Sequence, residues 1–451
     1  MRRVNVLVMI AVFFGLIALL SGSVTAATMY WDTSTDAGFQ AGNGTWDNNN
    51  TVAWSDSASD GTTPGMWTSG ADDALFGASG TSTVTVAGPP SANSVTISGT
   101  GYTLSGVMNV GGGGIIANES LTTTAPSLSA DQSWTIASGK AMYLVGNTPI
   151  DVGAANTLTI DGLGTLGSWT HPFRIGNGTV VQTHGGIYCA TYVMIGTTGD
   201  ATFTTTGGTM NMGKDFSLAY LAGTTSTVNQ NGGTIMVPRH STLGGAGLGT
   251  GVYNLNAGTL KLSGDTGLNQ TRWVSYDFNL NGGEMELSNP NSGSQSYTFD
   301  VQSGGAIIDV TNAAVTNTFN GALLEDAGSI GGGLQKLGAG TLSLAGANTY
   351  TGDTLVDAGT LSIGQAYLAD TSDVWIASGA VLDLGFGGTD TVNSLYLDGS
   401  LMSPGTYSVG NSGGYITGSG SLVVPVPEPS TLALLASGLL GLICSAWRKR
   451  K

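Results

Sequence analysis

The best candidate for acid–base chemistry in this sequence is a pair of glutamates two positions apart, Glu284 and Glu286. Alternate residues of a β-strand share a face, so both carboxyls would point the same way. An inverting glycoside hydrolase needs two carboxyls roughly 6.5–9.5 Å apart, which such a pair can supply. However, Lys261 lies one sequence repeat before Glu286, and opposite charges on an outward face form an ordinary solvated ladder. We favour the charge ladder over catalysis.

A basic cluster of Arg239, His240 and Arg272 is the second candidate. A polysaccharide lyase needs a basic group that accepts a proton from the sugar, and these residues are the best set in the chain. They fall in the least regular part of the repeats, where Arg and His are usually ordinary surface residues. The cluster keeps a polysaccharide-degrading enzyme open as the alternative function.

Metal and cofactor sites are not expected. The chain has three histidines and two cysteines, and His171 and His184 are isolated, so a zinc site lacks ligands. Glycine-rich runs lack the Lys-Ser/Thr of a phosphate-binding loop. We therefore predict no catalytic, cofactor-binding or metal-binding residue. Three acidic pairs could bind calcium weakly, with solvated loops as the default: Asp72 and Asp73, Glu325 and Asp326, and Asp353 and Asp357.

An internal repeat must position these side chains. A glycine-containing corner recurs at residues 207, 232, 257 and 282, a step of 25, and later corners step by 19 to 20. Glycine suits a corner with positive φ. Between corners the residues alternate, so apolar columns would face inward and asparagine columns outward, where amides can hydrogen-bond between repeats. The inward columns are Met210, Ile235, Leu260 and Met285; Met212, Val237, Leu262 and Leu287; and Phe203, Val228, Tyr253 and Phe278; the outward ones are Asn229, Asn254 and Asn279, and Asn231, Asn256 and Asn281.

This pattern predicts an all-β fold, a right-handed parallel β-solenoid (β-helix). A repeat of this length suits one coil, whereas a propeller blade would need about 40 residues or more. Residues 27–110 are expected to form an N-terminal β region whose aromatics, including Trp31, Trp46 and Trp54, cap the first coil. Residues 111–424 would form the repeats, and the segment from residue 395 to 424 would cap the other end.

Charge excludes one class of partner. The whole chain has a net charge of −16, and six of its 13 cationic residues lie in the two terminal segments described next. Without these six cations, and with Glu428 retained, the chain has 7 cations against 29 acidic residues, a net charge of −22. Nucleic-acid binding depends on cations that neutralise phosphate, so it is excluded. Cys444 falls in the terminal apolar segment, which leaves Cys189 without a disulfide partner once that segment is removed.

Residues 1–26 form a predicted secretory signal peptide with a signal helix. Arg2 and Arg3 give a positive start, residues 4–20 are apolar, and small residues follow up to a cleavage point after Ala26. The chain is therefore expected to use the export machinery.

Residues 425–451 combine a short motif, an apolar run and a basic end. The motif is Pro427-Glu428-Pro429, and residues 431–447 are long enough to barely span a membrane as a helix. The cations of the end would keep it on the cytoplasmic side; they are Arg448, Lys449, Arg450 and Lys451. This arrangement resembles the PEP-CTERM sorting signal of diderm bacteria. The resemblance implies an exosortase as partner, a transient transmembrane sorting helix in the inner membrane, and release or transfer of the processed protein. A plain C-terminal membrane anchor is the alternative.

Residues 331–364 carry a second resemblance. The stretch from Leu334 to Leu344 reads Leu-Gln-Lys-Leu-Gly-Ala-Gly-Thr-Leu-Ser-Leu, and Asn348-Thr349-Tyr350-Thr351-Gly352 follows. It is similar to the autotransporter-associated β-strand repeat, which implies a β-helical secreted passenger. An autotransporter would end in a membrane β-barrel, and here a sorting helix is expected in its place.

These observations predict an exported, non-enzymatic protein of the cell surface or extracellular matrix. It would be membrane-anchored before processing and would act in matrix or biofilm structure or in adhesion, with extracellular polysaccharide as a candidate partner. The alternative is an extracellular polysaccharide-degrading β-helix enzyme, a lyase or hydrolase.

Overall fold

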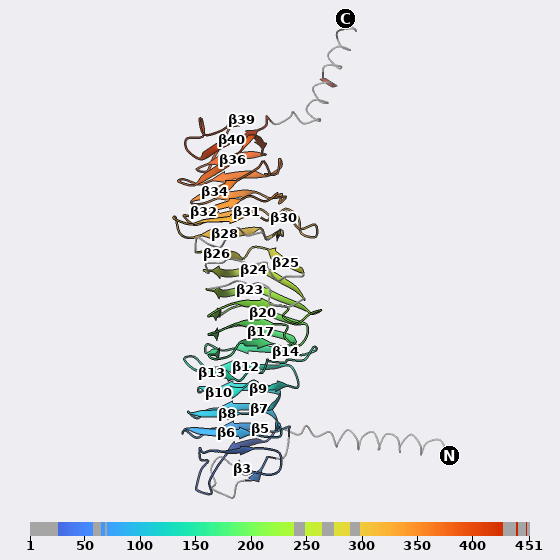
Figure 1. The fold of residues 1–451 in the computed structure, drawn as a ribbon, viewed down its shortest axis with the longest axis vertical. Helices are drawn as coiled ribbons and strands as arrows, with labels where there is room; N and C mark the ends of the chain where they lie inside the picture. The colour runs from blue at the N-terminus through green and yellow to red at the C-terminus, as the bar shows by residue number, and fades with distance from the viewer. Residues whose placement is uncertain are drawn as a thin grey trace, which may run out of the picture. The chain divides into compact units, whose positions relative to one another are not determined.

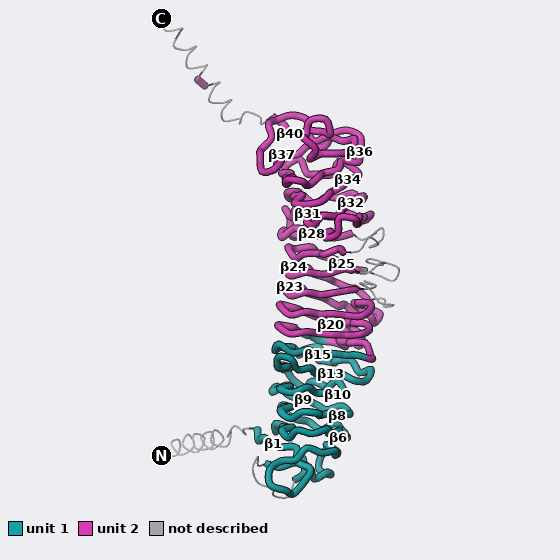
Figure 2. The backbone as a smooth tube through the Cα atoms, turned by 90° about the vertical axis from the view of Figure 1, so that its left-hand side faces the viewer, with its two compact units in different colours: residues 1–169, 178–180 teal, residues 170–177, 181–451 magenta. Residues whose placement is uncertain are grey.

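The computed structural model describes residues 26–56, 65–67, 70–238, 249–263, 275–288 and 298–426, with residues 439, 440 and 448. Apart from those last three residues, which are helical, every regular element described is a β-strand (Figure 1). The predicted all-β class is therefore confirmed. Two compact units are present, residues 1–169 with 178–180, and residues 170–177 with 181–451 (Figure 2).

The first unit consists of coils whose strands pair in parallel with the equivalent strands of the next coil, as in the stack of β6, β8, β10 and β13 in Figure 1. One column contains β1 (Thr28–Trp31), β5 (Asp73–Phe76), β7 (Ser91–Ile97), β9 (Asn109–Ala117), β12 (Gln132–Ile136) and β14 (Thr157–Asp161). The other contains β2 (Gly44–Trp46), β6 (Ser82–Val86), β8 (Tyr102–Ser105), β10 (Leu121–Thr124), β13 (Ala141–Val145) and β15 (Thr165–Ser168). The short β11 (Ser127–Leu128) pairs with the start of β9.

The beginning of this unit is closed by antiparallel strands and by tryptophans. β3 (Val52–Ser55) pairs antiparallel with β1 and with β4 (Gly65–Met66). Trp31, Trp46, Trp54 and Trp67 are each at most 1 % exposed, and the rings of Trp54 and Trp67 lie 4.7 Å apart. Large apolar rings exclude water from a coil end that no further coil covers. The aromatic residues predicted to cap the first coil are therefore buried together at this end of the unit.

The second unit repeats the parallel stacking in two long columns and two shorter sheets. The first contains β18 (Gly186–Cys189), β21 (Thr209–Met212), the ends of β23 (Thr225–Val237) and β24 (Thr250–Leu262), β26 (Glu284–Leu287), β28 (Ala306–Val310), β31 (Leu334–Leu337), β33 (Thr354–Val356), β35 (Asp373–Ile376) and β37 (Ser394–Leu397). The second contains β20 (Ala201–Thr205), the starts of β23 and β24, β25 (Ser275–Leu280), β27 (Phe299–Val301) and β30 (Leu323–Glu325). Two shorter sheets are separate from these columns. One contains β16 (Phe173–Ile175), β19 (Val193–Ile195) and β22 (Phe216–Leu218). The other contains β29 (Thr316–Phe319), β32 (Thr341–Leu344), β34 (Thr360–Ile363), β36 (Val381–Thr391) and β40 (Ile416–Val424). β17 (Gly178–Gln182) is divided between the two units.

Antiparallel strands also close the end of the second unit, as predicted for residues 395–424. β38 (Ser400–Leu401) pairs with β37, and β39 (Gly405–Tyr407) pairs with β40. Each unit is therefore a parallel β-solenoid, and antiparallel strands end the parallel stacking because they offer no equivalent edge for a further coil. The handedness of the coils and the domain limits at residues 26, 110 and 424 stay predictions.

The constant step between the regular corners is also the step of the strand register. Tyr253 lies opposite Val228 and Phe278, and all three inward columns predicted from the sequence are at most 4 % exposed. The corners require glycine: Gly258 has φ +76°, and a Cβ there would lie 2.3 Å from the carbonyl oxygen of Gly233. Only a residue without a side chain permits coils to approach this closely.

Residues 1–25 of the predicted signal peptide, which comprises residues 1–26, lie outside the described residues, as does most of the predicted sorting helix. Leu439 and Leu440 are helical and exposed. Within the described part of the chain, no helix has the length and apolar composition of a membrane span.

Candidate functional site: the outward columns and the buried corner donors

The outward asparagines form two hydrogen-bonded ladders. Asn254 donates from Nδ2 to Oδ1 of Asn229, and Asn279 donates in the same way to Asn254, both at 2.7 Å. The middle amide, that of Asn254, therefore donates one hydrogen bond and accepts one within the ladder. The second ladder has distances of 2.8 and 3.0 Å and consists of Asn231, Asn256 and Asn281. The predicted coil-to-coil ladder is confirmed.

Glu284 and Glu286 lie on the outward face of β26, as predicted. The ammonium of Lys261, in register one coil earlier, forms an ion pair with Glu286. Burial raises the pKa of Glu284, and the carboxylates of Asp309 and Glu286 raise this pKa further. The hydrogen bond to Glu286 raises the pKa of Lys261. Because Lys261 neutralises Glu286, these two residues form a structural charge ladder.

The six carboxylates considered for calcium are all hydrogen-bond acceptors within the fold. Asp73 accepts from Ser94 at 2.6 Å, Asp353 accepts from the backbone of Asp373 at 2.8 Å, and Asp357 accepts from Gln335 at 2.6 Å. The other three also accept backbone hydrogen bonds; they are Asp72, Glu325 and Asp326. These carboxylates thus link neighbouring coils or turns through hydrogen bonds.

The basic cluster of Arg239, His240 and Arg272 lies outside the described residues, so it stays a prediction. His171 is within 2.8 Å of the Thr170 hydroxyl through Nδ1. Among the residues that the structure describes, no group of three or more His, Cys, Asp or Glu could hold a metal ion. Cys189 is a buried free thiol that donates to the carbonyl of Tyr192 at 3.2 Å.

Sequence reasoning missed a set of buried polar side chains that serve the glycine corners. Gln230 is fully buried, and its Nε2 donates to the carbonyls of Gly233, at 3.3 Å, and Thr259, at 2.9 Å. The first carbonyl belongs to its own corner and the second to the next coil. Gln182 does the same for Gly185 and Thr209. A lone glutamine three positions before a corner glycine is the sequence signal for this role.

Lys336 is the charged member of this set. Its side chain is fully buried and lies in register between Ile308 and Val356, in an otherwise aliphatic column. Its Nζ donates to the carbonyls of Leu337 at 2.7 Å, Gly338 at 2.8 Å and Ala358 at 3.2 Å. Burial lowers the pKa of Lys336 to about 8, although nearby Asp309 opposes this. Lys336 thus fastens its own corner to the next one.

The sorting signal is described only in part. Pro427, Glu428 and Pro429 lie outside the described residues, as do the last three basic residues, Lys449, Arg450 and Lys451. Arg448 is helical and exposed.

Comparison with known families supports both resemblances found in the sequence. The passenger-associated-transport-repeat model matches residues 334–363, which include β31 to β34. The PEP-CTERM protein-sorting motif matches residues 425–451. The chain is thus a β-solenoid that carries a passenger repeat and an export-related sorting motif.

A curated relative matches part of the chain. The adhesin BmaC autotransporter of Brucella suis biovar 1 (strain 1330) is 39 % identical over 158 residues. The match covers 30 % of this chain but only 4 % of the adhesin, so this chain spans a small fraction of its relative's length. No solved structure matches the chain.

Proposed function

We propose that this chain is a non-enzymatic, adhesin-like β-solenoid of the cell surface or extracellular matrix. The observation that carries the proposal is the PEP-CTERM motif at residues 425–451, attached to a solenoid whose described carboxylate pairs serve its own coils. Similarity to an autotransporter adhesin over 158 residues supports it. An acidic chain with outward hydrogen-bonding columns suits contact with hydrated polymers of the matrix.

The proposed route has three steps. The export machinery removes residues 1–26, the terminal helix holds the chain transiently in the inner membrane, and an exosortase cuts near Pro427-Glu428-Pro429. Arg448 and the basic residues after it keep the tail on the cytoplasmic side until the cut. The processed protein then reaches the surface or the medium.

Fractionation of tagged full-length chain in the producing cell tests this route. Replacing Pro427, Glu428 and Pro429 together by alanine should leave the chain unprocessed and in the membrane fraction. Val426→Ala, one position outside the motif, is the matched control and should be processed normally. The sorting proposal is wrong if the triple variant is shortened and located like the wild type.

The non-enzymatic and adhesive roles need separate measurements. Purified processed protein should release no reducing ends or unsaturated products from matrix polysaccharides, and Arg239→Ala should change nothing in this assay. Cells that lack the protein should attach less to surfaces or form weaker biofilm, and added purified protein should restore the loss. Polymer cleavage that disappears in Arg239→Ala would instead establish the alternative enzyme.

A further inference from the structure

We propose that one outward face of the first unit is a binding track for an extended, neutral polysaccharide chain. The track runs over β6, β8, β10 and β13 and ends at an exposed pair of aromatic rings. This inference rests on the proposed surface function and assigns its ligand class and site. We call the six hydroxyl residues of the face the hydroxyl track; they are Thr83, Thr85, Thr103, Ser105, Thr122 and Thr124.

Strand register places these hydroxyls in two parallel columns. Thr103 lies opposite Thr83 on one side and Thr122 on the other. Thr85 lies opposite Ser105 in the second column. Adjacent strands are about 4.8 Å apart and alternate residues about 6.7 Å apart, so the hydroxyls form a regular grid. The exposed or half-buried state of every second residue in β6 and β8 shows that this face points away from the core.

The hydroxyl track differs from the asparagine ladders because its polar groups are not consumed by the fold. Within the part of the chain that the structure describes, only the side chain of Thr124 among these six takes part in a hydrogen bond, which it accepts from the backbone of Gly106 at 3.2 Å. The asparagine amides bond to one another instead. Among these described columns, the threonine grid therefore has donors and acceptors to offer to a ligand.

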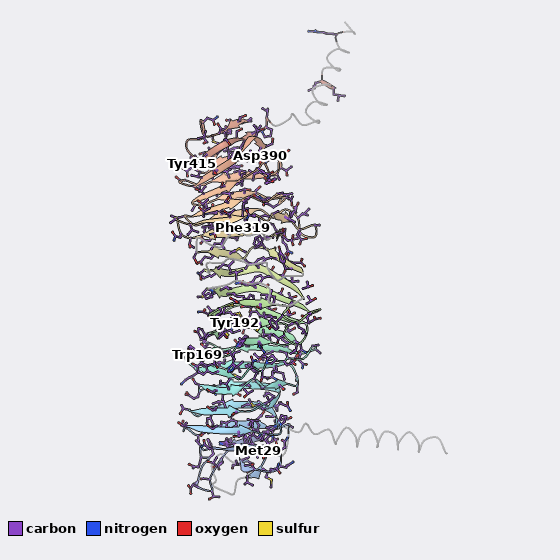
Figure 3. All side chains as sticks on the ribbon, viewed as in Figure 1. Met29, Trp169, Tyr192, Phe319, Asp390 and Tyr415 are labelled. Carbon is purple, nitrogen blue, oxygen red and sulfur yellow. The ribbon has the colours of Figure 1, made fainter. Side chains whose placement is uncertain are left out.

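An aromatic pair lies at the end of the track. Tyr143 follows Thr122 in register and lies opposite Gly167, which has no side chain to occupy the neighbouring position. The ring of Tyr143 is 6.0 Å from that of Trp169, at 47°. Trp169, labelled in Figure 3, is 55 % exposed. An exposed tryptophan beside a tyrosine offers apolar area and ring faces to a ligand.

The combination favours a sugar polymer over other occupants. A sugar ring has an apolar C–H face and a rim of hydroxyls, which match the aromatic pair and the grid respectively. In an extended β-linked chain, successive sugars recur at a distance similar to the strand spacing, so one sugar can lie over each coil. An ordered water surface such as ice has no apolar faces for Tyr143 and Trp169 to contact.

Charge selects a neutral polymer. Between residues 27 and 169 the chain has a single cation, Lys140, and 11 acidic residues. Anionic polysaccharides and a second copy of this chain are repelled by such a surface. The hydroxyl track itself contains no charged side chain, so a neutral chain binds without desolvating a carboxylate.

The test uses purified full-length processed protein and three probes: microcrystalline cellulose, chitin beads and soluble hydroxyethyl cellulose. The wild type should bind at least one of them. Trp169→Ala should weaken that binding about tenfold. The isosteric double change Thr103→Val with Thr122→Val should also weaken it about tenfold, because it removes two hydroxyls and keeps the shape.

A matched control comes from the second unit. Thr202 and Thr227 are outward and in register on β20 and β23, and replacing both by valine should leave binding unchanged. Thermal melting followed by circular dichroism verifies that each variant is folded. If Trp169→Ala does not fold, Trp169→Phe is tested in its place.

Four outcomes would overturn the proposal. The first is that the wild type binds none of the probes, and the second is that Trp169→Ala and the Thr103→Val, Thr122→Val double variant both bind normally. The third is that the control variant loses as much binding as the track variants. The fourth is that the protein inhibits ice recrystallisation and binds no polymer, and that the track variants abolish this inhibition. Failure of the proposed surface function would appear instead in the fractionation and attachment assays, which use the sorting-motif variant and cells that lack the protein rather than the track variants.

Discussion

Replacing Lys336 by methionine should remove an alkaline gain in stability from the wild-type protein. The folded pKa of Lys336 is about 8, against an ordinary value of 10.5. The unfolded chain therefore binds more protons than the folded chain between these two values, so the free energy of unfolding rises with pH. At about 1.4 kcal/mol per pH unit of difference, the gain between pH 7 and pH 9.5 is roughly 2 kcal/mol.

Urea unfolding of wild type and Lys336→Met at half-unit steps from pH 7 to 9.5 measures this difference. The window ends below the titration of the buried tyrosines, because burial raises the pKa of Tyr102 and that of Tyr350 to about 12 each. The midpoint of the wild type should move upward with pH relative to the variant. Lys140→Met is the control, since Lys140 is half-exposed and pairs with Glu119, and its curve should stay parallel to the wild type.

Two results would refute the reasoning. Parallel curves for wild type and Lys336→Met would mean that the ammonium keeps its ordinary pKa despite burial. A wild type that loses stability relative to the variant as pH rises would mean that the carbonyls of Leu337, Gly338 and Ala358 stabilise the charged form more than burial destabilises it.

Three further changes test the packing by urea unfolding. Asn317→Leu should stabilise the protein by about 1–3 kcal/mol, because the buried amide has no hydrogen-bond partner among the described residues and its register neighbour is Leu342; a loss of stability would contradict this. Asn254→Ala should cost roughly 1–2 kcal/mol for two lost amide hydrogen bonds, and an unchanged midpoint would show that the ladder is not stabilising. Gly258→Ala should cost clearly more than Gly379→Ala, which has a similar φ of +79° but nothing within 4 Å of a Cβ; equal costs would show that only φ, at about 1–2 kcal/mol, matters.

The regular coils were predictable because one constant step separates the corners at residues 207, 232, 257 and 282 and therefore determines both the register and the side of every column. Alternation alone then distinguished inward Leu260 from outward Lys261. The same reasoning cannot place Lys336, because in Leu334-Gln335-Lys336-Leu337 the two leucines are three apart and cannot both face inward. The pairing of Ile308 with Lys336 determines which alternate residues of β31 face inward, and it places the lysine among the buried ones.

The candidate sites also differ in whether the sequence alone could predict them. The charge ladder at Glu286 followed from the position of Lys261 one repeat earlier. The aromatic end of the hydroxyl track could not be predicted in this way. Tyr143 and Trp169 are distant in the sequence and lie outside the regular repeats, and they approach each other only through the register of β13 and β15. Long-range register of irregular coils is tertiary information that local pattern does not contain.

The buried corner donors have a consequence for how such a protein can change length. Gln230 bonds to its own corner and to the corner of the following coil, so each coil is completed by its successor. Duplicating or losing one whole coil returns an equivalent carbonyl to every donor. Inserting part of a coil instead leaves a buried glutamine facing apolar side chains, at a cost of about 1–3 kcal/mol. A change in length by one whole coil therefore preserves this hydrogen bonding, whereas a change by part of a coil does not.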